Sequence, residues 1–433
     1  MSARALIVCA ALAGCGDNAD PPIPAAPVFA NAYFPAVPRD ALDLLFVVDN
    51  SPAFAPVYDQ SFVAALPRFR AVLDQLDALP DLHVGVATSD LGVTGSLGRA
   101  QNTGGTSPAA CHDAGDDGRF RTDGLHTGAP FLVEEAGAIN ADVPFAQAVT
   151  RLVESTGGSG CAFGQHFAAM RRALTNPANG AFLRADANLA IVFLGGDDDC
   201  SVRDPALFVA DTTELGAFDT FRCTRAGLVC NEDIAAVGAK TGCRSNPDST
   251  YVDDVAPFVD FVRGLKPDRR NVMASAILGD PGNVAVADLT FQGGTMPQPT
   301  LVQACMWPLS PSGGSVAGPG VRDAQLVADL GGVVESICQQ DQGAQLTDLG
   351  HAVKRLVGDP CLADEPVGAC AVTDEHADGT TTPLPACPAD GDCYTLAADM
   401  RACPDTASHL RATITRTAAP LADTYVAVRC TPP

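Results

Sequence analysis

The sequence predicts an α/β protein with a doubly wound, mainly parallel sheet, followed by a small disulfide-rich β module. Short, continuous apolar runs alternate with segments of helical periodicity up to residue 358. Runs of this kind suit strands that are buried on both faces, as in a parallel sheet covered by helices. After Pro360 the helical periodicity disappears, and six cysteines follow between Cys361 and Cys430. This composition is typical of a small module held together by disulfides.

The first fourteen residues have the features of a bacterial lipoprotein signal peptide. Arg4 supplies a positive charge, and the apolar run at residues 5–13 is too short to span a bilayer. The run ends in Leu12-Ala13-Gly14-Cys15, which resembles a lipobox, where cleavage precedes a cysteine that then carries lipid. We therefore expect a signal peptide at residues 1–14 and lipidation at Cys15. An ordinary signal peptide with a cysteine there by chance is the alternative.

Residues 15–40 are predicted to be a lipidated tether, because prolines and alanines dominate this stretch. No later stretch reaches about 18 uninterrupted apolar residues, so the lipid at Cys15 would be the only membrane anchor. We therefore expect an exported protein, lipid-anchored to the bacterial cell envelope, with the outer membrane as the expected location.

The α/β domain is predicted over residues 41–358. Its helices are expected where apolar residues recur every three to four positions, with Pro67 the one awkward position. Strands are expected at residues 41–48, 82–89, 188–194, 271–278 and 331–334, with a short edge strand at 130–133. Helices are expected at residues 61–76, 145–153, 163–174, 255–265 and 345–357.

The C-terminal β module is predicted over residues 361–433. Apolar and polar residues alternate at residues 410–416 and 424–429, which is typical of strands with one buried face. A hydrolase in this module would need a deep polar pocket, which a small β module seldom provides.

The chain has 16 cysteines and no CxxC pair, which disfavours zinc ribbons and thioredoxin-type redox sites and favours disulfides formed in an oxidising compartment. Removal of Cys9 with the signal peptide and lipidation of Cys15 leave an even number that can all pair. Pairings expected from closeness in the chain are Cys223–Cys230, Cys305–Cys338 and Cys361–Cys370, and Cys161 is expected to bridge to Cys111. The candidates are Cys111, Cys161, Cys200, Cys223, Cys230, Cys243, Cys305, Cys338, Cys361, Cys370, Cys387, Cys393, Cys403 and Cys430.

Polar clusters follow two of the predicted strands. Asp49-Asn50-Ser51 ends the first strand, and Gly195-Gly196-Asp197-Asp198-Asp199 ends the strand at residues 188–194. Ligands of open α/β sheets bind beyond the carboxyl ends of the strands, and hard divalent cations prefer hydroxyl and carboxylate oxygens. We therefore expect both clusters at one rim of the sheet.

Four segments of the chain resemble von Willebrand factor A domains, in the version found in lipoproteins of myxobacteria and their relatives. Residues 44–51 resemble the first strand and metal-site loop of this family, and residues 82–92 resemble its next strand. Residues 160–165 and 198–201 also resemble that group. The combination is more specific than any one segment, and it covers most of the chain.

The resemblance implies a metal-ion-dependent adhesion site, which in this family is Asp-x-Ser-x-Ser with a further threonine and a later aspartate that hold magnesium. Asp49 and Ser51 match the first two positions, but the third falls on Ala53, which offers no oxygen. The late aspartate aligns with Gly196, beside Asp197, and the threonine is represented by Thr156 or Ser159. We therefore expect a degenerate site of Asp49, Ser51 and Asp197. It holds either no cofactor, its residues capping backbone, or a Mg²⁺ ion shifted toward Asp197.

Composition and missing motifs narrow the function further. The formal net charge of −24 repels phosphate backbones, so we expect no nucleic-acid partner. The sequence contains no G-x-S-x-G elbow, P-loop or dinucleotide fingerprint, and neither His83 nor His166 belongs to a known hydrolase pattern. The acidic segment at residues 113–118 is expected to be a solvated turn, since it lacks the spacing of a calcium loop.

We therefore expect a cell-envelope lipoprotein and not an enzyme. Its von Willebrand factor A-like domain would bind a protein or polysaccharide, and the N-terminal lipid would bind the membrane. The alternative is a purely structural envelope protein with no ligand at the degenerate site.

Overall fold

The computed structural model describes residues 30–52, 54, 61–93, 111, 114–126, 128–208, 215–216, 219–289, 297–307, 315–339, 341–362 and 369–430. The predicted signal peptide, the lipidation site Cys15 and the Ala53 position lie outside these residues. Within the described part of the chain, none of the helices has the length and apolar composition needed to cross a membrane.

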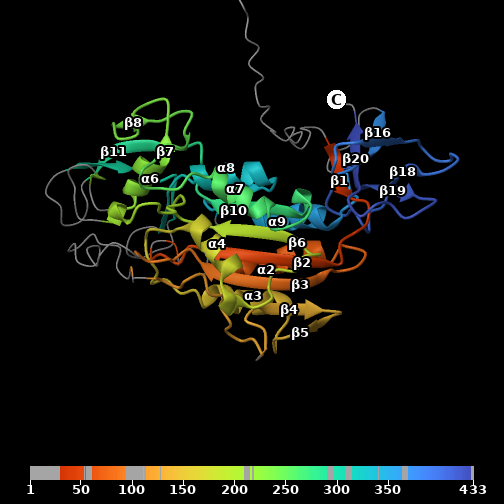
Figure 1. The fold of residues 1–433 in the computed structure, drawn as a ribbon, viewed down its shortest axis with the longest axis horizontal. Coiled ribbons are helices and arrows are strands. Elements are labelled where there is room, and N and C mark those ends of the chain that lie inside the picture. Colours follow the sequence, from red (N-terminus) through yellow and green to blue (C-terminus); the bar gives the residue numbers. More distant parts are fainter. Residues whose placement is uncertain are drawn as a thin grey trace, which may run out of the picture.

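The α/β domain is built on a seven-stranded sheet in the order β15-β10-β6-β2-β3-β4-β5 (Figure 1). Five strands are parallel to one another, while β4 runs antiparallel to β3 and pairs with β5 at the edge. The parallel strands are β2 (Ala41–Val48), β3 (Asp81–Thr88), β6 (Asn188–Leu194), β10 (Val272–Leu278) and β15 (Val334–Ser336), and the edge hairpin is β4 (Leu132–Glu135) with β5 (Ala138–Ile139).

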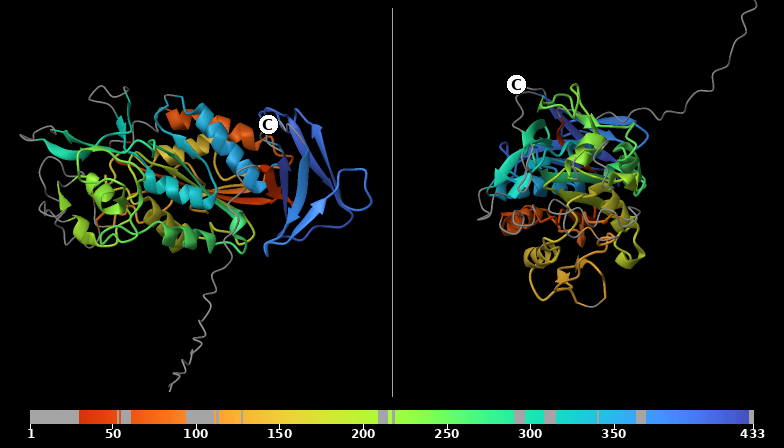
Figure 2. Two further views of the ribbon diagram at one scale, coloured as in Figure 1. Left: turned by 90° about the horizontal axis from the view of Figure 1, so that it is seen from above. Right: turned by 90° about the vertical axis from the view of Figure 1, so that its left-hand side faces the viewer.

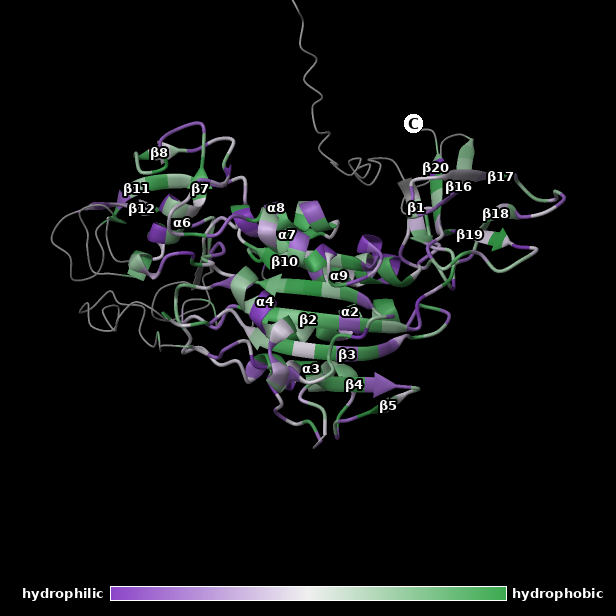
Figure 3. Cartoon of the chain, in the orientation of Figure 1, coloured by the Kyte–Doolittle hydropathy of each residue, from purple (hydrophilic) through white to green (hydrophobic). Residues whose placement is uncertain are grey.

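Helices cover both faces of this sheet (Figure 2), which explains the continuous apolar runs of its central strands. In β2, Leu44 and Phe46 belong to one core cluster, whereas Leu45 and Val47 belong to the other. Figure 3 shows the resulting hydrophobic centre of the sheet. One face carries α2 (Val63–Leu73), α3 (Phe145–Glu154) and α9 (Gly343–Val357), and the other carries α4 (His166–Thr175), α7 (Ala256–Arg263) and α8 (Val321–Leu330).

The predicted strands at residues 41–48 and 188–194 coincide with β2 and β6, and the other predicted helices and central strands differ from the observed ones by one to three residues at most ends. The last strand is an exception, because it lies at β15 and not at residues 331–334. Gly331 has a φ of 78° and ends α8, and a Cβ on Gly332 would lie 1.8 Å from the carbonyl oxygen of Ala274. These glycines therefore form a helix end and a close approach of two backbones.

The C-terminal module contains a sheet in the order β1-β20-β16-β17 and a separate hairpin. The prediction of a tether over residues 15–40 is wrong for residues 30–35, because these residues form β1, which pairs antiparallel with β20. Ala32 and Phe34 of β1 are buried in the core of the module, so alternate side chains of this segment point inward despite its linker-like composition. The strands are β1 (Ala30–Pro35), β16 (Cys370–Glu375), β17 (Thr381–Leu384), β18 (Cys393–Ala398), β19 (Leu410–Thr415) and β20 (Tyr425–Cys430).

Two long insertions meet at the end of the sheet where the parallel strands finish, opposite the C-terminal module (Figure 1). We call the described parts of residues 200–254 and 280–319 the rim insertion. Its two halves are joined because β8 pairs with β11. It contains α6 (Phe221–Gly227), β7 (Leu228–Val229), β8 (Gly238–Ala239), β9 (Arg244–Ser245), β11 (Ala285–Leu289), β12 (Gln298–Leu301), β13 (Cys305–Trp307) and β14 (Ser315–Ala317). Single 3₁₀ turns occur at Pro177–Asn179, Pro205–Phe208 and Arg269–Asn271.

All fourteen candidate cysteines form disulfides. Cys305 pairs with Cys338 and Cys111 with Cys161, as expected. The expected pairs Cys223–Cys230 and Cys361–Cys370 are wrong. The fold determines the partners: β7 and β9 bring Cys230 beside Cys243, and β16 and β20 place Cys370 opposite Cys430. The remaining pairs are Cys200–Cys223, Cys230–Cys243, Cys361–Cys403, Cys370–Cys430 and Cys387–Cys393.

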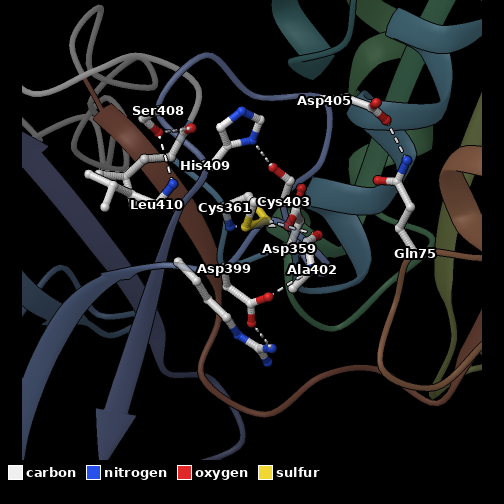
Figure 4. Close-up of a disulfide and its surroundings, with 12 residues drawn as sticks. Gln75, Asp359, Cys361, Asp399, Ala402, Cys403, Asp405, Ser408, His409 and Leu410 are labelled. Atoms are coloured by element: carbon white, nitrogen blue, oxygen red, sulfur yellow. Dashed lines mark hydrogen bonds and ion pairs between the residues drawn. A yellow bond between two sulfur atoms is a disulfide. The ribbon is translucent and has the colours of Figure 1, made fainter.

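The C-terminal module is attached to the α/β domain by a polar interface around the Cys361–Cys403 disulfide (Figure 4). Gln75, just beyond α2, donates a hydrogen bond to Asp405 of the module. The buried Lys354 of α9 donates to Gln75 Oε1 and to the carbonyl oxygen of Ala402, both at 3.2 Å. These hydrogen bonds join the module to the region of α2 and to α9.

Candidate functional site

The candidate site lies where the strand order of the sheet reverses. β2 and β6 are neighbours, but the chain leaves β2 toward β3 on one side and leaves β6 toward β10 on the other. Such a switch point opens a crevice beyond the carboxyl ends of the two strands, where ligands of doubly wound sheets bind. The two polar clusters predicted from the sequence follow these two strands, so the structure brings them together.

Asp49 connects the two loops at the switch point. Its Oδ1 accepts a hydrogen bond from the backbone N–H of Ser51 at 2.9 Å, and its Oδ2 accepts one from the N–H of Gly196 at 3.0 Å. The residue is 2% exposed. Each carboxylate oxygen therefore already has a backbone partner, which agrees with the alternative that these residues cap backbone at the strand ends.

Phe54 lies against the position that the family would give to its late aspartate. This side chain is 1% exposed, and a Cβ on Gly196 would lie 2.9 Å from Phe54 Cδ2. A carboxylate at position 196 would require Phe54 to move. Within the described residues there is no group of three or more His, Cys, Asp or Glu that could hold a metal ion. The surroundings of Asp49 and Gly196 therefore do not fit the oxygen-rich octahedron that Mg²⁺ requires.

Asp197 lines a small cavity beneath the rim insertion. Thr220, Cys223 and Leu301 also line this space, whose volume of about 10 Å³ is close to that of one water molecule. Loss of solvation, together with the nearby charge of Asp49, raises the pKa of Asp197 to about 7. Asp197 is thus near Asp49, but its surroundings offer too little space for a ligand larger than water.

The next two aspartates position helices. Asp198 Oδ1 accepts hydrogen bonds from the backbone N–H of Arg322 at 2.8 Å and of Asp323 at 3.3 Å, in the first turn of α8. Asp199 Oδ1 accepts one from the N–H of Phe167 at 3.0 Å, in the first turn of α4. Since the first N–H groups of a helix lack intrahelical partners, these carboxylates stabilise both helix starts.

Two buried cations lie among these carboxylates. Arg322 Nη2 is 3.0 Å from Asp199 Oδ2, and both side chains are fully buried. His166 Nδ1 is 3.0 Å from both oxygens of Asp323. Burial opposes the protonated imidazole, but the carboxylates of Asp323, Asp199 and Asp49 outweigh it and raise the pKa of His166 to about 10. We call His166, Asp198, Asp199, Arg322 and Asp323 the rim charge cluster.

The structure describes residues 114–118 of the predicted acidic turn, and these residues form a turn that is packed against the sheet and not a solvated one. Asp116 Oδ2 accepts hydrogen bonds from Thr88 Oγ1 at 2.6 Å and Arg121 Nη2 at 2.5 Å, and Asn50 Nδ2 lies 3.4 Å away. Gly115, with a φ of 50°, is packed against Asp90. The segment therefore closes over the ends of β2 and β3.

Of the two candidates for the family's threonine, Thr156 contacts the loop after β2 through its backbone, because its carbonyl oxygen accepts a hydrogen bond from Asn50 Nδ2 at 3.3 Å. The hydroxyl of Thr156 donates to the carbonyl oxygen of Val153 at 2.7 Å, at the end of α3, and Ser159 is exposed.

Phe54, Arg322 and Asp323 were not predicted from the sequence. Apolar residues spaced at Val321, Leu326, Val327 and Leu330, followed by Gly331, were the signal that could have placed a helix and its first-turn charges here.

No protein-family model matches the chain, and no curated protein matches it either. A conserved hypothetical protein, BatB, from Bacteroides thetaiotaomicron has 10% identity and a TM-score of 0.28, covering 73% of this chain and 98% of its own. A von Willebrand factor type A protein from Catenulispora acidiphila has 11% identity and a TM-score of 0.29, with coverages of 94% and 64%. The pilus adhesin SpaC from Lactobacillus rhamnosus GG has 11% identity and a TM-score of 0.30, with coverages of 92% and 40%. The similar structures thus include von Willebrand factor A proteins and adhesins, but at TM-scores too low to carry an argument.

Proposed function

We propose that this chain is an adhesion-type binding module of the von Willebrand factor A kind, of the lipoprotein type found in myxobacteria. In this proposal Cys15 carries the lipid that anchors the protein to the bacterial envelope. Its surface binds a protein or polysaccharide partner and catalyses no reaction. The seven disulfides support an oxidising, exported location.

The observation that carries the proposal is the position of β1. The described chain enters the fold in the C-terminal module, at the end of the sheet opposite the rim insertion (Figure 1). An anchor attached before β1 would therefore hold the C-terminal module toward the membrane and present the rim insertion to the exterior. Loops at the carboxyl ends of strands are also where α/β folds place their binding residues.

The rim insertion has the properties of a preorganised contact surface. Its two halves share the three-stranded sheet β12-β11-β8, and the disulfides Cys200–Cys223, Cys230–Cys243 and Cys305–Cys338 constrain it. Val237, next to β8, is 56% exposed, and Leu289, at the end of β11, is 44% exposed. Rigid loops that present apolar side chains lose little entropy on binding.

A binding experiment with two matched double variants tests this function. Fluorescently labelled protein spanning residues 16–433 is titrated onto intact cells and onto purified envelope polysaccharide. We expect saturable binding that Val237→Glu with Leu289→Glu abolishes. The control is Met400→Glu with Leu421→Glu, which changes two side chains of the C-terminal module that are 70% and 66% exposed, and it should bind normally. Absence of saturable binding would favour the purely structural alternative.

The anchor is tested separately. Cells that express the full chain are grown with radiolabelled palmitate, and the label should enter the wild-type protein but not Cys15→Ser. Labelled protein should fractionate with the outer membrane. Equal labelling of both proteins would contradict the assignment of Cys15.

A further inference from the structure

We propose that the rim of this protein works without a divalent cation, because Phe54 fills the space of the family's metal site while Arg322 and His166 neutralise the neighbouring carboxylates. This inference goes beyond the proposed adhesion function and does not depend on the identity of any partner. It concerns how the chain keeps an acidic rim folded when its metal site is degenerate.

The first step concerns space. Phe54 is buried beside Gly196, the position where an aspartate would complete the family's ligand set. Asp49 uses one carboxylate oxygen for the N–H of Ser51 and the other for the N–H of Gly196. An aromatic ring offers no lone pair to a hard cation, and Mg²⁺ requires near-octahedral oxygen ligands. The side chains at the metal position are thus packed against one another and against backbone.

The second step concerns charge. Asp198, Asp199 and Asp323 are all buried, and buried carboxylates are strongly destabilising unless cations lie beside them. Arg322 contacts Asp199 at 3.0 Å, and His166 contacts both oxygens of Asp323 at 3.0 Å. A divalent ion would supply two positive charges, and these two side chains supply the same charge from within the fold.

The third step concerns the rim insertion, because Arg322 also reaches it. Its Nη1 donates to Ser245 Oγ at 2.8 Å, and its Nη2 donates to the carbonyl oxygen of Asp253 at 2.5 Å. The Ser245 hydroxyl in turn donates to Asp254 Oδ1 at 2.7 Å. One side chain therefore joins the loop after β6 to the insertion that lies over it. Arg322 is a positioning residue for that surface, acting through Asp199 and the backbone of the insertion.

The test compares melting temperatures with EDTA and with 5 mM Mn²⁺ for the wild type, Arg322→Met, Arg322→Lys and Arg203→Met. Arg203 is the matched control, because it contacts Asp253 at 3.0 Å from a position where its side chain is 42% exposed. We expect the wild type and Arg203→Met to melt at the same temperature in both conditions. Arg322→Met should melt about 10 °C lower in EDTA and recover part of that loss in Mn²⁺. Arg322→Lys should recover part of it without metal.

Two results would overturn the proposal. One is calorimetric binding of Mn²⁺ to the wild type that is lost in Asp49→Ala, because the rim would then use a metal. The other is an Arg322→Met protein as stable as the wild type in EDTA, because the internal cation would then be unnecessary. If Arg322→Met does not fold, the wild-type titration and Arg322→Lys still decide the question. None of these measurements involves a binding partner, so failure of the adhesion proposal would be seen independently.

Discussion

The imidazole of His166 and the carboxylate of Asp323 form a buried ion pair between α4 and α8, with Nδ1 at 3.0 Å from both carboxylate oxygens. The same Asp323 accepts a hydrogen bond from the N–H of Asp199, which follows β6. One carboxylate therefore fixes two helices and a strand end at the switch point of the sheet. The ion pair exists only while His166 is protonated, so it should give the stability of the protein a distinctive pH dependence.

We expect the free energy of unfolding to fall as the pH rises from 7 to 10. The pKa of His166 is about 10 in the folded protein and 6.5 for an unperturbed histidine. A raised folded pKa contributes stability that is complete below the unfolded pKa and is lost as the pH rises through the folded value. The loss should be about 1.4 kcal/mol per pH unit within this window. Urea titrations of the wild type and Asp323→Asn measure it, and an equal slope in both proteins would contradict the assignment.

Asp49→Asn should destabilise the protein whether or not a divalent cation is present. The amide that replaces one carboxylate oxygen cannot accept a hydrogen bond, so the N–H of Ser51 or of Gly196 loses its partner. A buried unpaired donor costs about 1–3 kcal/mol. Asp74→Asn is the control, because its carboxylate is 53% exposed beside Arg70 and such surface pairs contribute little. Urea denaturation with EDTA and with Mg²⁺ measures the free energy of unfolding of both variants. A loss of stability in Asp49→Asn that occurs only with Mg²⁺ would indicate that Asp49 is a metal ligand instead.

Phe34→Ala should destabilise the C-terminal module, because β1 belongs to its core. Truncation of a buried phenylalanine costs about 3–5 kcal/mol, and Phe34 is 7% exposed. Val37→Ala, at a position that is 45% exposed, should change little. Limited proteolysis followed by mass spectrometry locates the effect. Cleavage of Phe34→Ala within the rim insertion alone would show that β1 does not support the module.

The Cys361–Cys403 disulfide should contribute more stability than Cys387–Cys393. The first closes a separation of 42 residues and the second a separation of 6. The chain-entropy relation then gives about 4 kcal/mol for the first and about 2 kcal/mol for the second. Paired serine substitutions at each disulfide, compared by thermal unfolding, test this order. A larger loss for the short loop would mean that contacts of the folded state, and not chain entropy, dominate.

The central strands could be predicted from the sequence because helices on both faces make their apolar runs continuous, as in β2 and β6. The polar residues that follow these strands identified the rim, because ligands of open α/β sheets bind beyond the carboxyl ends of the strands. Helix α8 was missed, since Pro319 and Gly320 precede it and its first turn contains the charged pair Arg322 and Asp323. The buried charges of this helix are stabilised by Asp198 and Asp199, which are distant in the chain.

The remaining differences have the same cause, which is long-range packing. β1 has the composition of a linker, and only its pairing with β20 reveals that Ala32 and Phe34 face a core. Phe54 follows the Asp49-Asn50-Ser51 loop, but no sequence pattern shows that it lies against Gly196. Disulfide partners such as Cys370 and Cys430 are adjacent because of strand register, which spacing in the chain does not report.

The pairing of β1 with β20 also constrains the order in which the protein can fold. Tyr33 of the first described strand lies opposite Ala427 of the last, so this contact spans nearly the whole chain and must form late. Until β20 has been synthesised, β1 has an open edge and exposes Phe34, which is a target for proteases and for aggregation. A chain that ends before β20 therefore cannot complete this sheet and leaves its first strand unpaired and exposed.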